Sequence, residues 1–170
     1  MAETYTDVHP GASSGIGLAT AHLFASQGAH VYNFDVHSPP DTNKHDFIGC
    51  DQSSWRSLLD AFNQIPAFDI AVANAGILER FNYFEDSFNA NGELEEPSHK
   101  ILDVNFVGTM NVVKIALSRL RKQGKGGSVV MTASCSGYMA ENQVPMYTAG
   151  KTAVCPLSIQ VKTSSLTGAL

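Results

Sequence analysis

The chain has few charged residues, few cysteines and no long apolar run. Charged residues make up 16% of its 170 residues and hydrophobic ones 44%, a balance that excludes a disordered chain. The length predicts one domain spanning residues 1–170. Lys and Arg (11) are outnumbered by Asp and Glu (16), and this excess of negative charge argues against a nucleic-acid partner.

The cysteines and histidines form no recognisable cluster. Cys50, Cys135 and Cys155 are widely spaced without a CxxC pair, so they are expected to be reduced, structural thiols of a cytoplasmic protein. The six histidines lack metal-ligand spacing, and no metal site is expected. The longest apolar stretch, Ile70 to Leu78, is far shorter than the roughly 20 residues of a membrane-spanning helix, so no membrane partner is expected.

Short apolar runs alternate with stretches of helical spacing. The predicted strands are 29–34, 47–50, 68–73 and 128–132. Helices are predicted after the glycine-rich segment 11–17, after Asp51, from Pro97 to about Lys122, and around Tyr147. Because the strands are almost continuously apolar and alternate with helices, the pattern predicts an α/β fold with a parallel sheet covered on both faces.

Helical spacing also predicts which side chains share a face toward the core. In the first helix these are Ile16, Ala19, Leu23 and Phe24. In the second helix they are Trp55, Leu58, Leu59, Phe62 and Ile65. In the third helix they are Ile101, Val104, Gly108, Val112, Ile115 and Leu120. A polar, acidic insert, 79–96, precedes this third helix.

A glycine-rich turn runs into the first predicted helix. Gly11, Gly15 and Gly17 would let backbone N–H groups and the helix dipole meet a pyrophosphate. Asp35 ends the next strand, where an acidic residue accepts the ribose 2′-hydroxyl and repels a 2′-phosphate, so NAD is favoured over NADP. Taken alone, the glycines also fit a merely tight turn between strand and helix.

A second group of residues lies near the end of the last strand. Tyr147 and Lys151 are four residues apart and share one helix face, with Ser134 upstream at the strand's end. A neighbouring ammonium favours the ionised form of a phenol, which makes Tyr147 a workable general acid and base.

Five motifs in this order resemble those of the short-chain dehydrogenases/reductases, a family of Rossmann-fold oxidoreductases. They are GASSGIG (11–17), ANAG (73–76), DVNFVG (103–108), SCSG (134–137) and YTAGK (147–151). The resemblance covers roughly residues 11–154. It implies a doubly wound parallel sheet in three α/β/α layers with strand order 3-2-1-4-5.

The resemblance also implies a catalytic tetrad of Asn105, Ser134, Tyr147 and Lys151. In it Tyr147 transfers the proton and Ser134 hydrogen-bonds the substrate oxygen. Lys151 favours the ionised phenol and holds the nicotinamide ribose, while Asn105 orders a water that relays protons to Lys151.

A cofactor site is implied in the same way. Its residues are Gly11, Ser14, Gly15, Ile16 and Gly17 for the pyrophosphate, Asp35 for the adenosine ribose, Asp51 and Gln52 for the adenine, and Asn74, Ala75 and Gly76 beside the cofactor. The expected cofactor is NAD, with NADP disfavoured by Asp35, and it supplies the hydride.

Plainer interpretations of three of these residues stay open. Ser134 fits a helix cap or turn, Asn105 fits an ordinary polar position within a helix, and Asp51 fits the N-cap of the second helix.

The chain departs from the family's pattern at both ends. The family's first strand is apolar, whereas Tyr5–Pro10 is polar and ends in a proline, which speaks against a regular central strand. Near the other end, Pro156 is expected to interrupt the helix, leaving an atypical tail at 156–170 without the family's last strands and most of its substrate pocket. We therefore expect a shortened family member with exposed apolar surface and an uncovered sheet edge.

The leading prediction is a NAD-dependent oxidoreductase that interconverts a secondary alcohol and a ketone on a small organic substrate. The alternative is a catalytically silent dinucleotide-binding or interaction protein. The helix at 98–122 is the candidate surface for a homodimer, and the silent alternative would pair with a full-length relative through Ile101 to Leu120 of the same helix. A SAM-dependent methyltransferase also uses a glycine-rich turn, but its chemistry does not require Ser134, Tyr147 and Lys151 at these spacings.

Overall fold

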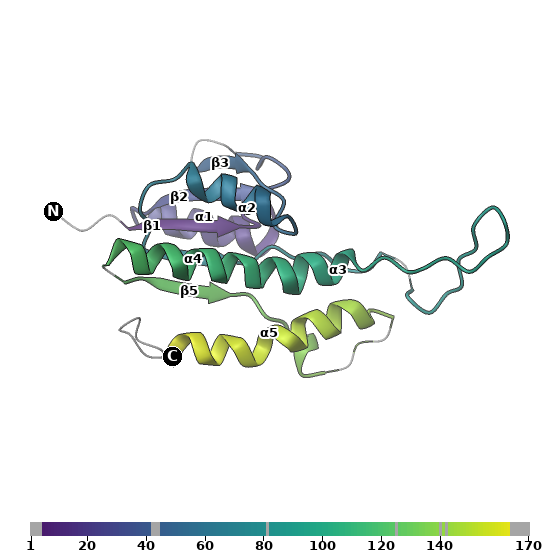
Figure 1. Ribbon diagram of the computed structural model, residues 1–170. Helices are drawn as coiled ribbons and strands as arrows, with labels where there is room; N and C mark the ends of the chain where they lie inside the picture. Colours follow the sequence, from purple (N-terminus) through teal and green to yellow (C-terminus); the bar gives the residue numbers. More distant parts are fainter. Residues whose placement is uncertain are drawn as a thin grey trace.

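A five-stranded parallel sheet with the order β3-β2-β1-β4-β5 forms the centre of the molecule (Figure 1). The computed structural model describes residues 5–41, 45–80, 82–124, 126–139, 141 and 143–163. The strands are β1 (Thr6–Pro10), β2 (His30–Asp35), β3 (Asp46–Gly49), β4 (Ile70–Ala73) and β5 (Ser128–Met131). The helices are α1 (Gly15–Ser26), α2 (Trp55–Asn63), α3 (Lys100–Leu102), the π-helical η1 (Asp103–Gly108), α4 (Thr109–Gln123), the 3-10 turn η2 (Cys135–Gly137) and α5 (Pro145–Thr163).

Helices cover both faces of the sheet, as the Rossmann-type prediction requires. α1 packs against β1 and β2, while α2 packs on α4, which lies against β4 and β5. The main core gathers apolar side chains from these strands and from α2, α4 and α5, among them Val8, Phe34, Leu58, Phe62, Val112 and Val154. The α/β fold and its strand order are therefore confirmed.

The polar segment at the start of the chain does form the central strand, contrary to the expectation from its sequence. β1 pairs with β2 from Thr6 to Pro10 and with β4 through Asp7 and Val8. Pro10 is tolerated because it is the last residue of the strand. Its carbonyl accepts from the N–H groups of Asn74 (3.2 Å) and Ala75 (2.9 Å), and the next amide, Gly11, donates to Phe34 O (2.8 Å).

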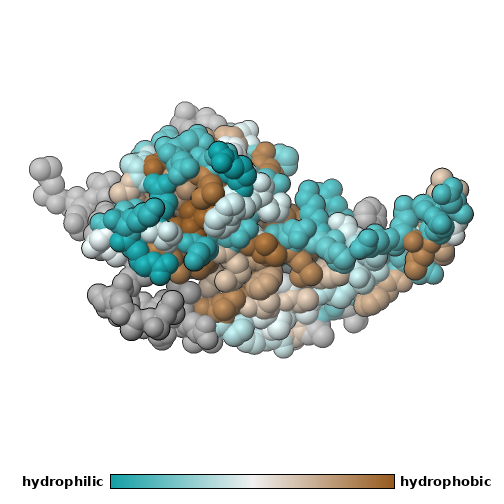
Figure 2. All heavy atoms as spheres, in the orientation of Figure 1, coloured by the Kyte–Doolittle hydropathy of each residue, from teal (hydrophilic) through white to brown (hydrophobic). Residues whose placement is uncertain are grey.

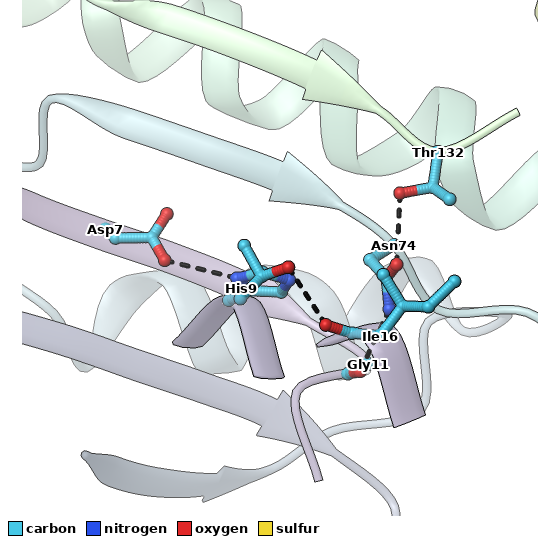
Figure 3. Close-up of polar contacts among 7 residues, drawn as sticks. Asp7, His9, Gly11, Ile16, Asn74 and Thr132 are labelled. Carbon is cyan, nitrogen blue, oxygen red and sulfur yellow. Dashed lines mark hydrogen bonds and ion pairs between the residues drawn. The ribbon is translucent and has the colours of Figure 1, made fainter. Parts of the chain in front are cut away.

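Two ionisable residues of β1 are completely buried, on the sheet face opposite Val8. His9 Nδ1 lies 3.2 Å from Asp7 Oδ2, and Figure 3 shows the two side chains side by side along the strand. Asp7 Oδ1 and His9 Nε2 have no hydrogen-bond partner among the described residues. Burial raises the pKa of the Asp7 carboxyl, and the contact with His9 offsets this only in part.

The core-facing predictions hold best for the longest helix. Its six predicted core positions, from Ile101 to Leu120, are all buried. In α2, Leu58 and Phe62 are buried but Trp55 is 45% exposed, so the prediction for Trp55 is wrong. In α1 the predicted face is wrong: Ile16 and Leu23 are exposed, and the helix approaches the sheet through the small residues Gly17 and Ala21. Small side chains allow this close approach, which apolar spacing alone does not reveal.

Pro156 does not interrupt the last helix. α5 continues from Pro145 to Thr163 with Pro156 inside it, and Val154 and Cys155 just before the proline are buried. A proline within a helix removes one backbone hydrogen bond and a buried apolar face can outweigh that loss. The rest of the predicted tail, 164–170, lies outside the described residues.

Exposed apolar side chains include some at an edge of the sheet and some on the segment before α3. Val130 on β5 is exposed, and among the described residues β5 pairs only with β4, so it forms an edge of the sheet. The segment 82–98 projects away from the body (Figure 1), and its surface mixes hydrophilic and hydrophobic groups, including the exposed Phe84, Phe88 and Leu94 (Figure 2). Both observations agree with the expected apolar surface and uncovered edge.

One helix, Lys100–Gln123, is long and apolar enough to cross a membrane by length and composition alone. Half of its most apolar window is buried within the fold, as befits a core helix.

Candidate functional site

The turn between β1 and α1 depends on two of its glycines. Gly11 has φ +83°, a left-handed conformation that favours glycine. A Cβ atom on Gly17 would lie 1.9 Å from Gly11 O and 2.5 Å from Asn74 Nδ2. These glycines therefore bring the start of α1 down onto the ends of β1 and β4.

The start of α1 offers backbone donors at the protein surface. Ser14 is the N-cap residue, and no side-chain hydrogen bond caps the helix there. Ser14, Gly15 and Ile16 are exposed, and a Cβ on Gly15 would have open space around it. Exposed N–H groups at a helix N-terminus suit an anionic phosphate, so the residues present fit a pyrophosphate.

Asp35 stands beside this turn at the carboxyl end of β2. Its Oδ2 accepts from the N–H of Ser13 at 3.2 Å, and its Oδ1 accepts from the N–H of His37 at 3.1 Å. The half-buried carboxylate is thus fixed next to the glycine turn, with lone pairs left to accept from hydroxyl groups.

Asn74 holds together the carboxyl ends of three strands. Its Nδ2 donates to Gly11 O at 3.1 Å, and its Oδ1 accepts from Thr132 Oγ1 at 3.0 Å; Figure 3 shows Asn74 between these two residues. Two residues on, a Cβ on Gly76 would lie 3.3 Å from Asn105 Oδ1 and 3.6 Å from Lys151 Nζ. The segment 74–76 therefore connects the glycine turn to the predicted tetrad.

The two residues predicted to contact adenine lie in the turn between β3 and α2. Asp51 is not the N-cap of α2: Ser54 occupies that place and accepts from the N–H of Ser57 at 3.3 Å, while Asp51 Oδ1 accepts from Ser53. The Gln52 side chain is buried and donates to Val104 O at 2.9 Å. Their contacts with adenine stay predictions.

Asn105 is not an ordinary polar residue within a helix. It lies in the π-helical η1, is completely buried, and clamps the backbone of Ile77: Ile77 N–H donates to Asn105 Oδ1 (2.8 Å) and Asn105 Nδ2 donates to Ile77 O (2.7 Å). Its own carbonyl accepts from Thr109 Oγ1 at 2.9 Å. π-Helical turns are often found at functional sites.

Ser134 does cap a turn, and it also belongs to a hydrogen-bonded series. Its Oγ accepts from the N–H of Ser136 at 3.2 Å at the start of η2. The same hydroxyl donates to Ser136 Oγ at 3.1 Å, and Ser136 donates to Glu141 Oε1 at 2.5 Å. The position of the Ser134 oxygen is therefore set by two neighbours that the sequence prediction did not include.

Tyr147 and Lys151 share a face of α5, as their spacing predicted. Lys151 Nζ is 5.8 Å from the centre of the Tyr147 ring and donates to Thr132 O at 2.7 Å. Burial lowers the pKa of the Lys151 ammonium, and the Cys155 thiol offsets this in part. An ammonium has three N–H donors, so after the hydrogen bond to Thr132 O two N–H groups of Lys151 can donate to other acceptors.

Sequence reasoning missed Glu79, which follows the segment clamped by Asn105. The Glu79 carboxylate accepts from the backbone N–H of Met146 at 2.7 Å and of Tyr147 at 3.1 Å. The only sequence signal was that α5 begins at a proline preceded by valine, without a capping side chain of its own.

Next to the start of α5 is an open cavity of about 610 Å³, lined by Asn82, Phe84, Glu141, Gln143, Pro145, Thr148 and Ala149.

The sequence predicts that the cysteines and histidines are structural residues. Cys50 and Cys155 are buried and Cys135 is exposed, with no disulfide among the described residues. Burial raises the pKa of the Cys50 thiol to about 11. No group of three His, Cys, Asp or Glu residues in the described part of the chain could hold a metal ion.

Comparison with known proteins identifies relatives that match most of the chain. Short-chain dehydrogenase/reductase prx4 of Penicillium roqueforti is 50% identical over 151 residues, covering 86% of this chain and 46% of that protein. Galactitol 2-dehydrogenase of Agrobacterium fabrum is 30% identical over 155 residues, covering 85% of this chain and 58% of that protein. The chain therefore spans about half the length of the curated relatives it matches.

A solved structure gives the same result. The structure of 4-hydroxyisoleucine dehydrogenase complexed with NADH superimposes with a TM-score of 0.76 at 27% identity, covering 92% of this chain and 67% of that chain. A family model described as short chain dehydrogenase matches residues 8–165. The chain belongs to the short-chain dehydrogenase family.

Proposed function

We propose that this chain is a NAD-dependent oxidoreductase that interconverts a secondary alcohol and a ketone, with Tyr147 as general acid and base. The observation that carries the proposal is that α5 and the segment 74–76 come close together. Lys151 Nζ on α5 lies 5.8 Å from the centre of the Tyr147 ring. A Cβ on Gly76 would lie 3.6 Å from Lys151 Nζ and 3.3 Å from Asn105 Oδ1. The Tyr147 phenol, the buried Lys151 ammonium and the Asn105 side-chain amide therefore lie near one another, beside the segment 74–76.

The exposed amides of Ser14, Gly15 and Ile16 would hold the pyrophosphate, and Gly11 and Gly17 keep the turn tight enough for it. Asp35 would accept the adenosine ribose hydroxyls and repel a 2′-phosphate, which favours NAD over NADP. Asp51 and Gln52 would flank the adenine, and Asn74, Ala75 and Gly76 the rest of the cofactor. A relative's structure that contains NADH supports this choice of cofactor.

When bound, the nicotinamide supplies or accepts the hydride. Tyr147 would give a proton to the substrate oxygen in reduction and take one in oxidation. Ser134, whose oxygen is positioned by Ser136, would hydrogen-bond that same oxygen. Lys151, fixed by Thr132, would favour the ionised phenol and bind the ribose, and Asn105 would order the water that relays protons to Lys151.

The substrate is proposed to be a small organic alcohol or ketone. The cavity beside α5 has a lining that is more apolar than polar, and its polar side chains, among them Asn82, Glu141 and Thr148, suit a substrate with hydroxyl groups. The similarity to galactitol 2-dehydrogenase supports this class. The proposal also places the protein in the cytoplasm, with two copies paired through the helix at 98–122.

A thermal melt of the purified chain with and without NAD⁺ or NADH tests the cofactor part. At about 100 times Kd, binding to the native state adds about 2.7 kcal/mol, which raises Tm by roughly 5–10 °C for a domain of this size. We expect that rise with NAD(H) and not with NADP⁺, together with NADH-linked turnover over a panel of polyols and ketones. Binding without turnover on the panel would favour the alternative, a silent dinucleotide-binding protein.

A further inference from the structure

The helix that carries Tyr147 begins without a capping side chain of its own. α5 starts at Pro145, which has no N–H, and Val144 before it has no side-chain oxygen. The next two backbone N–H groups, of Met146 and Tyr147, belong to the first helical turn and need acceptors from elsewhere.

Glu79 supplies those acceptors from a distant part of the chain. Its Oε1 accepts from Met146 N–H at 2.7 Å and from Tyr147 N–H at 3.1 Å, and its Oε2 lies 3.3 Å from the same Tyr147 nitrogen. A carboxylate at a helix N-terminus forms charge-assisted hydrogen bonds and interacts favourably with the helix dipole. Glu79 therefore caps α5 in place of a local residue.

The same short segment is held at its other end by Asn105. Ile77, two residues before Glu79, exchanges two hydrogen bonds with the Asn105 side chain, at 2.8 and 2.7 Å. Residues 77–79 thus connect the buried Asn105 on η1 to the backbone of Tyr147 on α5. A displacement at Glu79 would move the first turn of α5, where Tyr147 lies, while Lys151, one turn further on, is anchored separately to Thr132.

We propose that Glu79 is a positioning residue for Tyr147, which fixes the first turn of α5 so that the phenol stays aligned with Lys151 and Ser134. This inference rests on the proposed function, because it assigns Tyr147 to the reaction. Glu79 itself touches neither the substrate nor the cofactor in this account, so it acts through the backbone of Tyr147.

The test compares Glu79→Ala with Glu79→Gln, whose side-chain oxygen can still accept from both N–H groups. Glu79→Ala is expected to lower kcat by roughly 10- to 100-fold, the cost of a small misplacement of a reacting group. KM for NAD⁺ should stay within about twofold, because Lys151, which is proposed to hold the ribose, is anchored separately to Thr132. Glu79→Gln should recover most of kcat. Glu96→Ala, an exposed glutamate of the same segment, is the matched control and should behave as wild type.

A second measurement keeps the inference testable without turnover. Hydrogen exchange at the Met146 and Tyr147 amides should be faster in Glu79→Ala than in wild type and Glu79→Gln. Unchanged exchange would overturn the cap, and faster exchange with unchanged kcat would overturn the positioning role. A folded, NADH-binding wild type without any turnover would overturn the proposed function instead, while the exchange comparison would still decide the cap. If Glu79→Ala fails to fold, Glu79→Asp, whose side chain is one methylene shorter, takes its place. Hydrogen exchange and kcat are then compared between Glu79→Asp and Glu79→Gln.

Discussion

The Lys151 ammonium lies 5.8 Å from the centre of the Tyr147 ring while it donates to Thr132 O at 2.7 Å. Thr132, the residue that follows β5, therefore fixes the cation beside the phenol, and the cation is buried. A charge in such a low-dielectric position acts on its neighbours more strongly than it would in water.

Replacing Lys151 with Met should remove this effect while keeping the volume of the side chain. We expect turnover to fall by roughly 10²- to 10⁴-fold, the usual contribution of a positioned acid and base. Binding of NADH should also weaken, because the ammonium is proposed to hold the ribose. Lys114→Met on the surface of α4 serves as the control; a Lys151→Met variant as active as this control would contradict the account.

Asp35→Asn should change cofactor preference. The amide can keep the contact with the Ser13 N–H, seen at 3.2 Å, but it carries no charge to repel a 2′-phosphate. We expect NADP⁺ to raise the melting temperature of this variant and not of wild type. NAD⁺ binding should weaken by about 1.5–3 kcal/mol, the value of a hydrogen bond to a charged group. A variant that still ignores NADP⁺ would show that Asp35 does not select the cofactor.

The buried pair in β1 predicts non-additive changes in stability. His9→Val leaves the Asp7 carboxyl without its 3.2 Å partner, which should lower the free energy of unfolding by about 3–5 kcal/mol. The double variant Asp7→Val with His9→Val restores an apolar strand and should be neutral or more stable than wild type by up to about 4 kcal/mol. Urea unfolding measures all of these; a double variant that simply sums the two single losses would be inconsistent with a costly buried pair.

Asp7 also predicts how stability depends on pH. Its pKa is raised in the folded state by burial, so the folded protein binds the proton more tightly than the unfolded chain does. The contribution of Asp7 to stability is therefore fully present below the unfolded pKa of about 3.9 and is lost as the pH rises through the folded pKa. Asp7→Asn should gain stability relative to wild type as the pH is raised from about 4 to 8. A constant difference between the two proteins over that range would refute this.

The α/β class and the long buried helix are predicted well because they depend on local spacing, and the strand order is predicted well because the five motifs resemble those of a family. It misjudges β1 because a strand's place in a sheet is decided by its neighbours: β2 and β4 supply partners for Thr6–Pro10 whatever its polarity. It misjudges the packed face of α1 because Gly17 and Ala21 count for little in an apolar pattern, although they allow the closest contact.

Residues that support the candidate site from a distance are the hardest to predict. Ser136 and Glu141 act on Ser134 through hydrogen bonds, and Glu79 reaches α5 across 68 positions of sequence. None of these contacts follows a helical or strand period, so only the folded arrangement reveals them. The proposed tetrad can be named from the sequence because its residues lie in motifs that resemble those of the family, and their roles stay predictions.

The role of Tyr147 is tested by comparing wild type with Tyr147→Phe in one preparation, measuring NADH-linked turnover and the rise in melting temperature that NADH causes. Removing the single hydroxyl should nearly abolish turnover, by roughly 10²-fold or more, while the NADH-induced rise in Tm stays unchanged. Turnover in Tyr147→Phe equal to that of wild type would contradict the assignment of Tyr147 as the general acid and base.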